Sequence, residues 1–154
     1  MKQIERILRG RALAGALLVA LPVLAHAQVA IAPAVAPAPV ASAVTTPSGL
    51  VYRSLREGAG KSPTAADTVK VNYRGTFPDG REFDSSYARN EPATFPLDHV
   101  IKCWTEGVQR MKVGGKAQLV CPPQIAYGAR GAGGVIPANA TLQFDIELLE
   151  INPR

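Results

Sequence analysis

From residue 100 to residue 111 the chain has apolar residues at helical spacing, and this segment holds the only tryptophan of the sequence. Val100, Trp104, Val108 and Met111 follow positions i, i+4, i+8 and i+11, which places them on one face of a helix. The segments around it alternate apolar and polar residues, as half-buried strands do. One amphipathic helix among strands can bury its apolar face only against a sheet. The sequence therefore predicts an α+β fold, a bent antiparallel half-barrel wrapped over one short helix, with Trp104 between the layers.

Local signals predict where the helix and the strands begin and end. We expect Asp98 to cap the helix and Gly114-Gly115 to end it. Phe77-Pro78-Asp79-Gly80 is expected to form a turn, because proline fixes φ and Asp-Gly accepts positive φ. The long glycine-rich segment 124–140 is expected to be a functional loop. Strand-like segments, of which about five are expected to form the sheet, lie at residues 50–57, 68–76, 81–85, 93–97, 116–121 and 141–151.

Residues 1–27 have the three parts of a secretory signal peptide. A basic start precedes an apolar run from Ala12 to Ala25, which is too short to span a bilayer. Ala25-His26-Ala27 has the pattern of small residues that signal peptidase cleaves. We therefore expect cleavage after Ala27, export to the periplasm or, alternatively, secretion, and no stable membrane anchor in the cleaved chain. The basic residues of the start are Lys2, Arg6, Arg9 and Arg11.

The segment 28–46 is nearly all alanine, valine and proline. Pro33, Pro37 and Pro39 prevent a helix, so we expect a flexible, extended spacer here and a single domain over residues 47–154. The alternative for the spacer is a proline-rich ligand for a partner protein.

The basic balance of the chain comes mostly from its first 27 residues. They hold four basic residues and one acidic residue, so of the formal net charge of +5 the rest of the chain keeps +2. The arginines and lysines of the strand-like segments stand singly between apolar neighbours. Because nucleic-acid binding needs a continuous basic stripe, we expect no nucleic-acid partner.

Six of the aromatic residues fall on inward strand positions, on the helix or beside the long loop, and together they could wall a cavity. The alternative is that they are simply the core of a small domain. Asp84 directly follows one of them, and another lies beside Gly128, where backbone freedom lets its hydroxyl lean over an opening; both observations favour a pocket. The six residues are Tyr73, Phe83, Phe95, Trp104, Tyr127 and Phe144.

Other catalytic chemistries find little support. His99 is the only histidine after residue 27 and no Gly-x-Ser-x-Gly motif occurs, which argues against a serine hydrolase. The histidines, cysteines and carboxylates lack metal-ligand spacing, and the run Gly128–Gly134 lacks the Gly-Lys-Ser/Thr ending of a phosphate-binding loop. We expect neither a metal nor a cofactor.

Five motifs, spread in order over residues 47–152, together resemble the FKBP-type peptidyl-prolyl cis/trans isomerases. The resemblance implies a bent five-stranded antiparallel sheet over a short helix and a pocket that holds a prolyl ring on Trp104. Two positions depart from the family pattern: Ala93 stands where an aromatic residue is frequent, which widens one wall, and Cys103 stands where glycine is usual. The motifs lie at residues 71–75, 80–86, 100–107, 126–128 and 136–144. The start of the matching region, Thr46-Pro47-Ser48-Gly49-Leu50, resembles exported bacterial members of the family in particular.

The resemblance also implies roles for individual residues. Phe83 is expected to pack against the rotating bond, while the Tyr127 hydroxyl and the Ile101 amide donate to substrate carbonyls. Asp84 is expected to orient or polarise the amide. The catalytic residues are thus expected to be Tyr73, Phe83, Asp84 and Tyr127, and the substrate-binding residues Phe95, Val100, Ile101, Trp104, Ile136 and Phe144.

The expected function is peptidyl-prolyl isomerisation that assists the folding of exported proteins, with unfolded or proline-containing polypeptides as partners. The alternative is a periplasmic chaperone that holds unfolded chains in the same pocket with little catalysis. We expect a monomer, because the chain shows no helical arm before Pro47.

Two cysteines suggest a disulfide. Export puts Cys103 and Cys121 in an oxidising space, where an even number of cysteines favours pairing. A bridge would join the helix start to the strand that leads into the Tyr127 loop. The alternative is two separate buried thiols.

Overall fold

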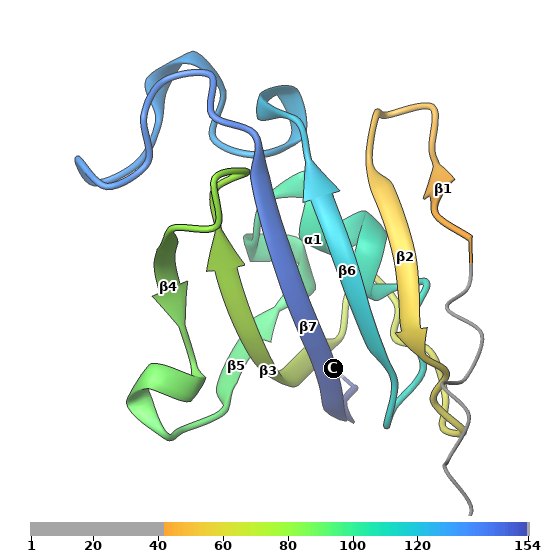
Figure 1. The fold of residues 1–154 in the computed structure, drawn as a ribbon. Coiled ribbons are helices and arrows are strands. Elements are labelled where there is room, and N and C mark those ends of the chain that lie inside the picture. The colour runs from red at the N-terminus through yellow and green to blue at the C-terminus, as the bar shows by residue number, and fades with distance from the viewer. Residues whose placement is uncertain (1–41, 154) are drawn as a thin grey trace, which may run out of the picture. The chain divides into compact units, whose positions relative to one another are not determined.

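The computed structural model describes residues 42–153, and these form an antiparallel sheet that bends over one helix (Figure 1). The arrangement confirms the predicted α+β half-barrel. The signal-peptide prediction and the spacer up to residue 41 lie outside the described residues. The elements are β1 (Val44–Thr45), β2 (Val51–Arg56), β3 (Thr68–Thr76), β4 (Glu82–Ser85), β5 (Ala93–Pro96), α1 (Lys102–Val108), β6 (Lys116–Cys121) and β7 (Leu142–Asn152), with short 3-10 turns at 87–89, 97–99, 123–125 and 128–130.

The sheet has the strand order β1-β2-β6-β7-β3-β4, and β5 pairs with β3 beside β4. All pairs are antiparallel. The long strand β7 lies in the middle and pairs with both β3 and β6, so the C-terminal strand joins the two halves of the sheet. The hydrogen-bonded sheet has seven strands, whereas about five were expected from the sequence. The number is higher because the short strands β1, of two residues, and β4 and β5, of four residues each, also pair with the sheet.

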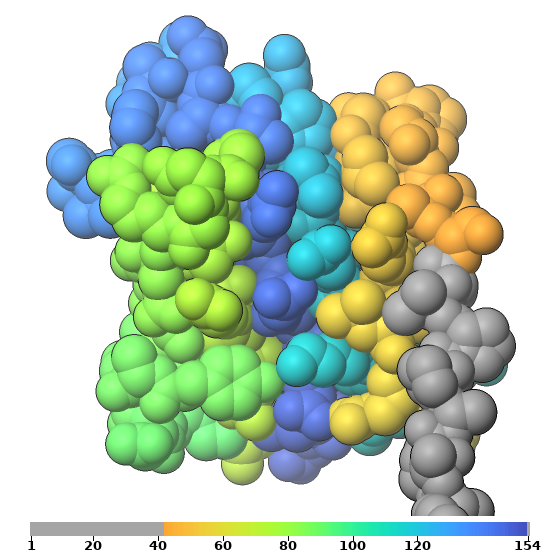
Figure 2. Space-filling model, viewed as in Figure 1, coloured from red at the N-terminus to blue at the C-terminus, as the bar shows by residue number. Residues whose placement is uncertain are grey.

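Alternation along the long strands sends one side of the sheet toward α1. Val69, Val71 and Tyr73 of β3 are buried, and every second residue of β6 and β7 is buried in the same way. Helix α1 packs on this side against β6, where a Cβ on Gly107 would lie 2.6 Å from Leu119 Cδ1. Figure 2 shows the other face of the sheet, in the same view as Figure 1, and there the strands cover α1. The absence of a side chain at Gly107 thus lets the helix lie close to the sheet.

The helix is shorter than the sequence pattern predicts. The expected face is buried at Trp104, Val108 and Met111, but α1 ends at Val108 and the chain continues in turns to Gly114, whose φ is +85°. Asp98 does not cap α1, because residues 97–99 form a separate 3-10 turn and Ile101 takes the N-cap position without a side-chain hydrogen bond.

Ordered structure begins before Pro47, where the sequence places the start of the domain. Val44 and Thr45 pair with β2, and Thr46 is buried. The Thr46 amide donates to the Leu50 carbonyl and the Ser48 hydroxyl donates to Glu106 of α1. These contacts fasten the last residues of the expected spacer to the sheet edge and the helix.

Cys103 and Cys121 form a disulfide, which confirms the predicted pairing. Their Cα atoms are 5.7 Å apart, within the usual range for a bridge, and both side chains are fully buried. The bridge joins the first turn of α1 to the end of β6 and therefore fixes the helix residue next to Trp104. No helix among residues 42–153 is long and apolar enough to cross a membrane.

Candidate active site

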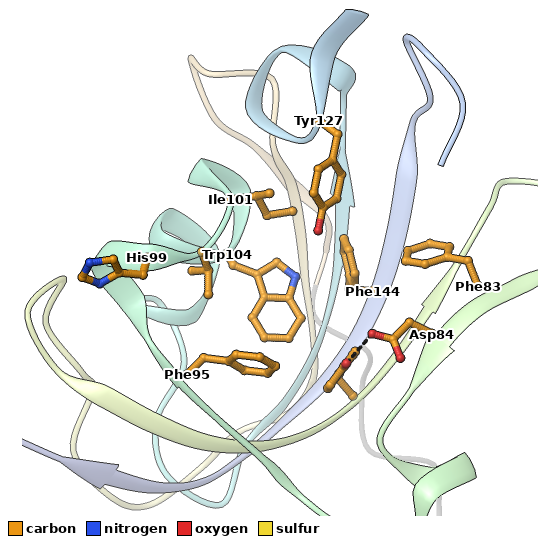
Figure 3. A pocket seen from close by; sticks show the side chains of 10 residues that line it. Phe83, Asp84, Phe95, His99, Ile101, Trp104, Tyr127 and Phe144 are labelled. Atoms are coloured by element: carbon orange, nitrogen blue, oxygen red, sulfur yellow. Dashed lines mark hydrogen bonds between the residues drawn. The ribbon is translucent and has the colours of Figure 1, made fainter. Parts of the chain in front are cut away.

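A cavity of about 430 Å³ opens on the helix side of the sheet, with the indole of Trp104 at its base (Figure 3). Its walls come from four strands, from the start of α1 and from the loop that follows β6. The lining residues are Tyr73, Phe83, Asp84, Phe95, His99, Val100, Ile101, Trp104, Tyr127 and Phe144.

Three aromatic rings surround the indole edge to face. The ring centroids of Tyr73, Phe95 and Phe144 lie 5.2, 5.5 and 5.4 Å from that of Trp104, at angles between 82° and 90°. This arrangement is favourable because the positive edge of one ring meets the negative face of the next. Only 4% of the surface of Trp104 is exposed, so the indole is held in place and forms an apolar base for the cavity.

Phe83 forms the wall opposite the helix. Its ring packs at 5.6 Å against Phe144 and at 5.1 Å against Phe77. A glycine at position 75 of β3 makes room for this pair, since a Cβ there would lie 2.6 Å from Phe83 Cζ and 3.1 Å from Phe144 Cε1. The backbone of β3 therefore sets how closely two pocket rings approach each other.

One carboxylate enters this apolar wall, held by two hydrogen-bond donors. The Tyr73 hydroxyl donates to Asp84 Oδ2 at 2.5 Å, and Arg89 Nη1 donates to Asp84 Oδ1 at 2.5 Å. Arg89 Nη2 also donates to the Tyr73 hydroxyl oxygen at 2.9 Å. The three side chains form a closed network, so the carboxylate and the phenol cannot rotate independently.

This network keeps Asp84 ionised. Partial burial acts to raise the pKa of Asp84, but the hydrogen bonds from Tyr73 and Arg89 and the charge of Arg89 outweigh it, and the pKa lies below its ordinary value. Burial, and then the hydrogen bond to Asp84, raises the pKa of Tyr73. Burial, and then the charge of Asp84, raises the pKa of Tyr127. At neutral pH the site therefore contains one carboxylate and two neutral phenols.

Two polar groups of the site differ in how accessible they are to a bound molecule. Trp104 Nε1 is buried and has no hydrogen-bond partner among the described residues. Tyr127 is 39% exposed, and its hydroxyl points into the cavity from the loop above it (Figure 3). The site offers apolar surface and a few hydrogen-bond donors, and a chemistry that relies on positioning rather than on a nucleophile suits it.

Nine of the ten residues predicted for the site line the cavity. Ile136 is not among them; it is buried and exchanges two backbone hydrogen bonds with Ala132, which close the loop end. Sequence reasoning missed His99 at the rim and Arg89 in the network. The sequence signal for Arg89 was only its position five residues after Asp84, and an arginine at that position by itself suggests nothing more than a surface charge. Residues 42–153 bring no three metal-binding side chains together.

Comparison with known proteins gives a consistent result. The sequence model of a family described as FKBP-type peptidyl-prolyl cis-trans isomerase matches residues 60–149. The chain is 54% identical over 109 residues to the FKBP-type peptidyl-prolyl cis-trans isomerase FkpA of Escherichia coli K12, covering 71% of this chain and 40% of that protein. It is 48% identical over 110 residues to the peptidyl-prolyl cis-trans isomerase Mip of Coxiella burnetii, covering 71% and 48%. The chain thus spans less than half the length of these curated relatives.

Solved structures agree with the sequence matches. The crystal structure of FkpA from Escherichia coli superposes with a TM-score of 0.70 at 52% identity, covering 72% of this chain and 52% of that one. A peptidyl-prolyl cis-trans isomerase from Pseudomonas syringae gives a TM-score of 0.67 at 40% identity, covering 71% and 80%. The residues that match this family also form the bent sheet and the aromatic cavity. The chain therefore belongs to the FKBP-type peptidyl-prolyl cis-trans isomerase family.

Proposed function

We propose that this chain is a peptidyl-prolyl cis/trans isomerase that rotates Xaa-Pro bonds of unfolded polypeptides. The observation that carries the proposal is the cavity itself, an indole base with three rings packed edge to face around it. A proline ring is apolar and flat enough to lie on such a base. The relatives described above are named for the same activity, peptidyl-prolyl cis-trans isomerisation.

The physics of amide rotation explains how such a cavity can catalyse. Rotation about the C–N bond meets a barrier of about 18 to 20 kcal/mol because resonance gives the bond double-bond character. Water stabilises the planar, charge-separated amide more than the twisted one. A cavity that excludes water removes this preference, and contacts that fit the twisted amide better lower the barrier further. No covalent step is needed.

Each wall then has a role. Trp104, with the rings packed around it, holds the proline ring, and Phe83 packs against the rotating bond. Ile101 is fixed at the N-cap of α1, where its carbonyl accepts from the Trp104 and Thr105 amides, so its own N–H has a constant direction for a substrate carbonyl. The Tyr127 hydroxyl donates to a second carbonyl, and Asp84 orients the amide. Val100 completes the wall beside the indole.

The test is cis/trans exchange of a short prolyl peptide, measured by NMR with catalytic amounts of the protein. We expect exchange to become faster than the uncatalysed process, which takes tens of seconds or more. Trp104→Leu removes the indole base and should reduce the acceleration while a folded domain remains. Exchange at the uncatalysed rate with folded wild-type protein would overturn the proposal.

A second function uses the same cavity to hold unfolded chains without accelerating rotation. It is favoured by two exposed apolar residues of the loop above the cavity, Tyr127 at 39% and Val135 at 57%. A protease-coupled prolyl assay and an aggregation assay separate the two functions. Catalysis without suppression of aggregation supports the isomerase, and the reverse supports the chaperone.

The proposal includes the compartment and the state of assembly. The pattern of residues 1–27 supports export, and the buried disulfide between Cys103 and Cys121 supports an oxidising compartment such as the periplasm, with secretion as the alternative. Exported proteins that contain proline are then the substrates. We propose that the chain acts as a monomer, without a cofactor and without nucleic acid.

A further inference from the structure

A second hollow of about 370 Å³ lies beside the candidate active site. It is formed by the end of the short 3-10 turn after β4, by the residues that follow it and by the start of β5. None of these residues belongs to the aromatic cavity described above. The lining residues are Arg89, Glu91, Pro92, Ala93 and Thr94.

Two residues connect this hollow to the aromatic cavity. Arg89 lines the hollow and at the same time donates to Asp84 and to the Tyr73 hydroxyl, which both line the cavity. Ala93 is two residues before Phe95 on β5, so their side chains leave the strand on the same face. Ala93 also pairs with Val71, two residues from Tyr73 on β3. A peptide with its proline in the cavity can therefore reach the hollow with a neighbouring residue.

The small side chain at position 93 keeps the hollow open. Ala93 is partly buried, packs against the hydrophobic core opposite Val71 and lines the hollow, so a larger side chain there would take up space in it. Together with Pro92 it gives the hollow an apolar wall. The stem of a long side chain can lie along such a wall while its polar end stays in water.

Of the two charged side chains that line the hollow, one is paired within the protein and the other is not. Arg89 is neutralised by Asp84, with which it forms a salt bridge at 2.5 Å. Glu91 is exposed and lines the hollow, and within residues 42–153 its carboxylate has neither a hydrogen bond nor an ion pair. The backbone of Glu91 is held by a bond from its amide to the Ser86 carbonyl. The backbone that carries this uncompensated negative charge is therefore held beside the apolar wall.

We propose that this hollow is a specificity subsite that binds a lysine or arginine next to the proline of the substrate. The aliphatic stem of that residue packs on Pro92 and Ala93, and its cation pairs with Glu91. The inference rests on the proposed isomerase function, because it places the proline in the aromatic cavity. It adds a preference for basic neighbours of proline, set by Glu91.

The test compares tetrapeptides with lysine, leucine or glutamate directly before the proline, and a second series with these residues directly after it. We expect kcat/KM for the lysine peptide of one series to exceed that of the leucine peptide by about threefold to fivefold at low salt, the range of an exposed ion pair. The glutamate peptide should be the poorest. In 0.5 M salt the preference should fall toward one, because screening at that ionic strength acts within a few ångströms.

Two variants locate the effect. Glu91→Gln should bring the lysine-to-leucine ratio to about one, and Ala93→Phe should lower the ratio by filling the hollow. Glu150→Gln removes another exposed carboxylate, on β7, and should leave the ratio as in the wild type. A wild-type ratio near one in both series, or a ratio that persists in Glu91→Gln, would overturn the subsite.

Binding measured through the single tryptophan separates this inference from the proposed function. Trp104 lies at the base of the cavity, so its fluorescence reports peptide binding without turnover. A lysine preference in affinity that Glu91→Gln abolishes, without any acceleration of rotation, would keep the subsite and overturn the isomerase. Acceleration of rotation with equal affinity and equal kcat/KM for all peptides would keep the isomerase and overturn the subsite.

Discussion

At the scale of single residues, the wall carboxylate Asp84 is the group most open to experiment. Its side chain is 43% exposed and is held by Tyr73 and Arg89, so replacing it disturbs the site more than the fold. We predict that Asp84→Val reduces turnover of a short prolyl peptide at least tenfold, equivalent to about 1.4 kcal/mol of lost transition-state stabilisation. The melting temperature should change little.

The matched control for Asp84→Val is Asp145→Val. Asp145 lies on β7 and accepts a hydrogen bond from Gln118 at 3.2 Å, outside the cavity. Its replacement should leave turnover as it is in the wild type. Equal turnover in Asp84→Val and the wild type would remove the carboxylate from the mechanism.

The lowered pKa of Asp84 has a consequence for stability. The folded-state pKa lies below the unfolded value of about 3.9, so the ionised carboxylate stabilises the fold above that pH, and this stabilisation is lost as the pH falls through the folded-state pKa. We predict that the difference in unfolding free energy between the wild type and Asp84→Asn is constant from pH 8 to pH 5. It should shrink below about pH 4.

Urea unfolding at several pH values measures this difference. Because Asp84 and Arg89 are both half exposed, we expect it to stay below about 1 kcal/mol. Arg89→Met should weaken the pH dependence of the difference without abolishing it, because it removes the charge and one of the hydrogen bonds that lower the pKa of Asp84 and leaves the hydrogen bond from Tyr73. A difference that grows toward acid would contradict the assignment.

The same residues mark how far sequence reasoning reaches at this scale. The rings could be placed, because inward positions of strands follow from alternation. Arg89 could not, because its role depends on the turn at 87–89, which brings its guanidinium back to Tyr73 and Asp84. Ile136 was expected in the cavity wall, but it is buried at the loop end, where its backbone pairs with Ala132, and it is not among the residues that line the cavity.

At the scale of elements, strands were predicted more accurately than the helix. The bounds of β3 and β6 agree with the sequence prediction, because each alternates strictly and is bounded by turn residues. The helix was expected to continue toward Gly114, since Met111 follows the same apolar spacing. The chain buries Met111 from a turn instead, so helical spacing alone did not reveal where the helix ends.

Strand β3 controls the pocket through a residue that has no side chain. We predict that Gly75→Ala lowers kcat/KM several-fold and destabilises the fold by about 1 to 3 kcal/mol, because its Cβ would meet Phe83 at 2.6 Å and push it from Phe144. Phe83→Leu in the Gly75→Ala background should restore stability but not activity. Urea unfolding and the peptide assay together check this, and an active, stable Gly75→Ala protein would contradict it.

The disulfide is the one covalent link between the helix and the sheet. Its 18-residue separation gives roughly 3 kcal/mol of stabilisation in the chain-entropy model. We predict that reductant lowers the unfolding free energy of the wild type by about this amount. The variant with Cys103→Ala and Cys121→Ala together should be insensitive to reductant, and a wild type that unfolds at the same urea concentration with and without reductant would refute the claim.

At the scale of the whole molecule, the sheet order explains how distant sequence segments meet in one site. β7, which comes last in the chain, pairs with β3 on one side and β6 on the other and brings Phe144 beside the rings of Phe83 on β4 and Trp104 on α1. Sequence patterns gave the strands but not this order, which rests on which edges pair. The family resemblance implies a bent antiparallel sheet over a short helix, which the structure confirms, and the order of the strands comes from the structure alone.

The export signal, the compartment and the disulfide can be tested together in a single measurement on the exported protein. When the full chain is expressed in a bacterium with an intact export pathway, we expect the protein recovered from the periplasm to begin at Gln28, because Ala25-His26-Ala27 precedes that residue. Its intact mass should be two hydrogens lower than that of the reduced form, since Cys103 and Cys121 are its only cysteines and form a bridge. Alkylation before reduction should then add nothing.

Ala25→Leu and Ala27→Leu together provide the control for this measurement. The large side chains violate the small-residue rule of the cleavage site and should leave the chain uncut, with residues 1–27 still in place. Because the bridge forms on the same side of the membrane, the uncut chain should still carry it. A mature chain with two alkylated thiols would place folding in a reducing compartment, and an uncut wild-type chain would end the export hypothesis.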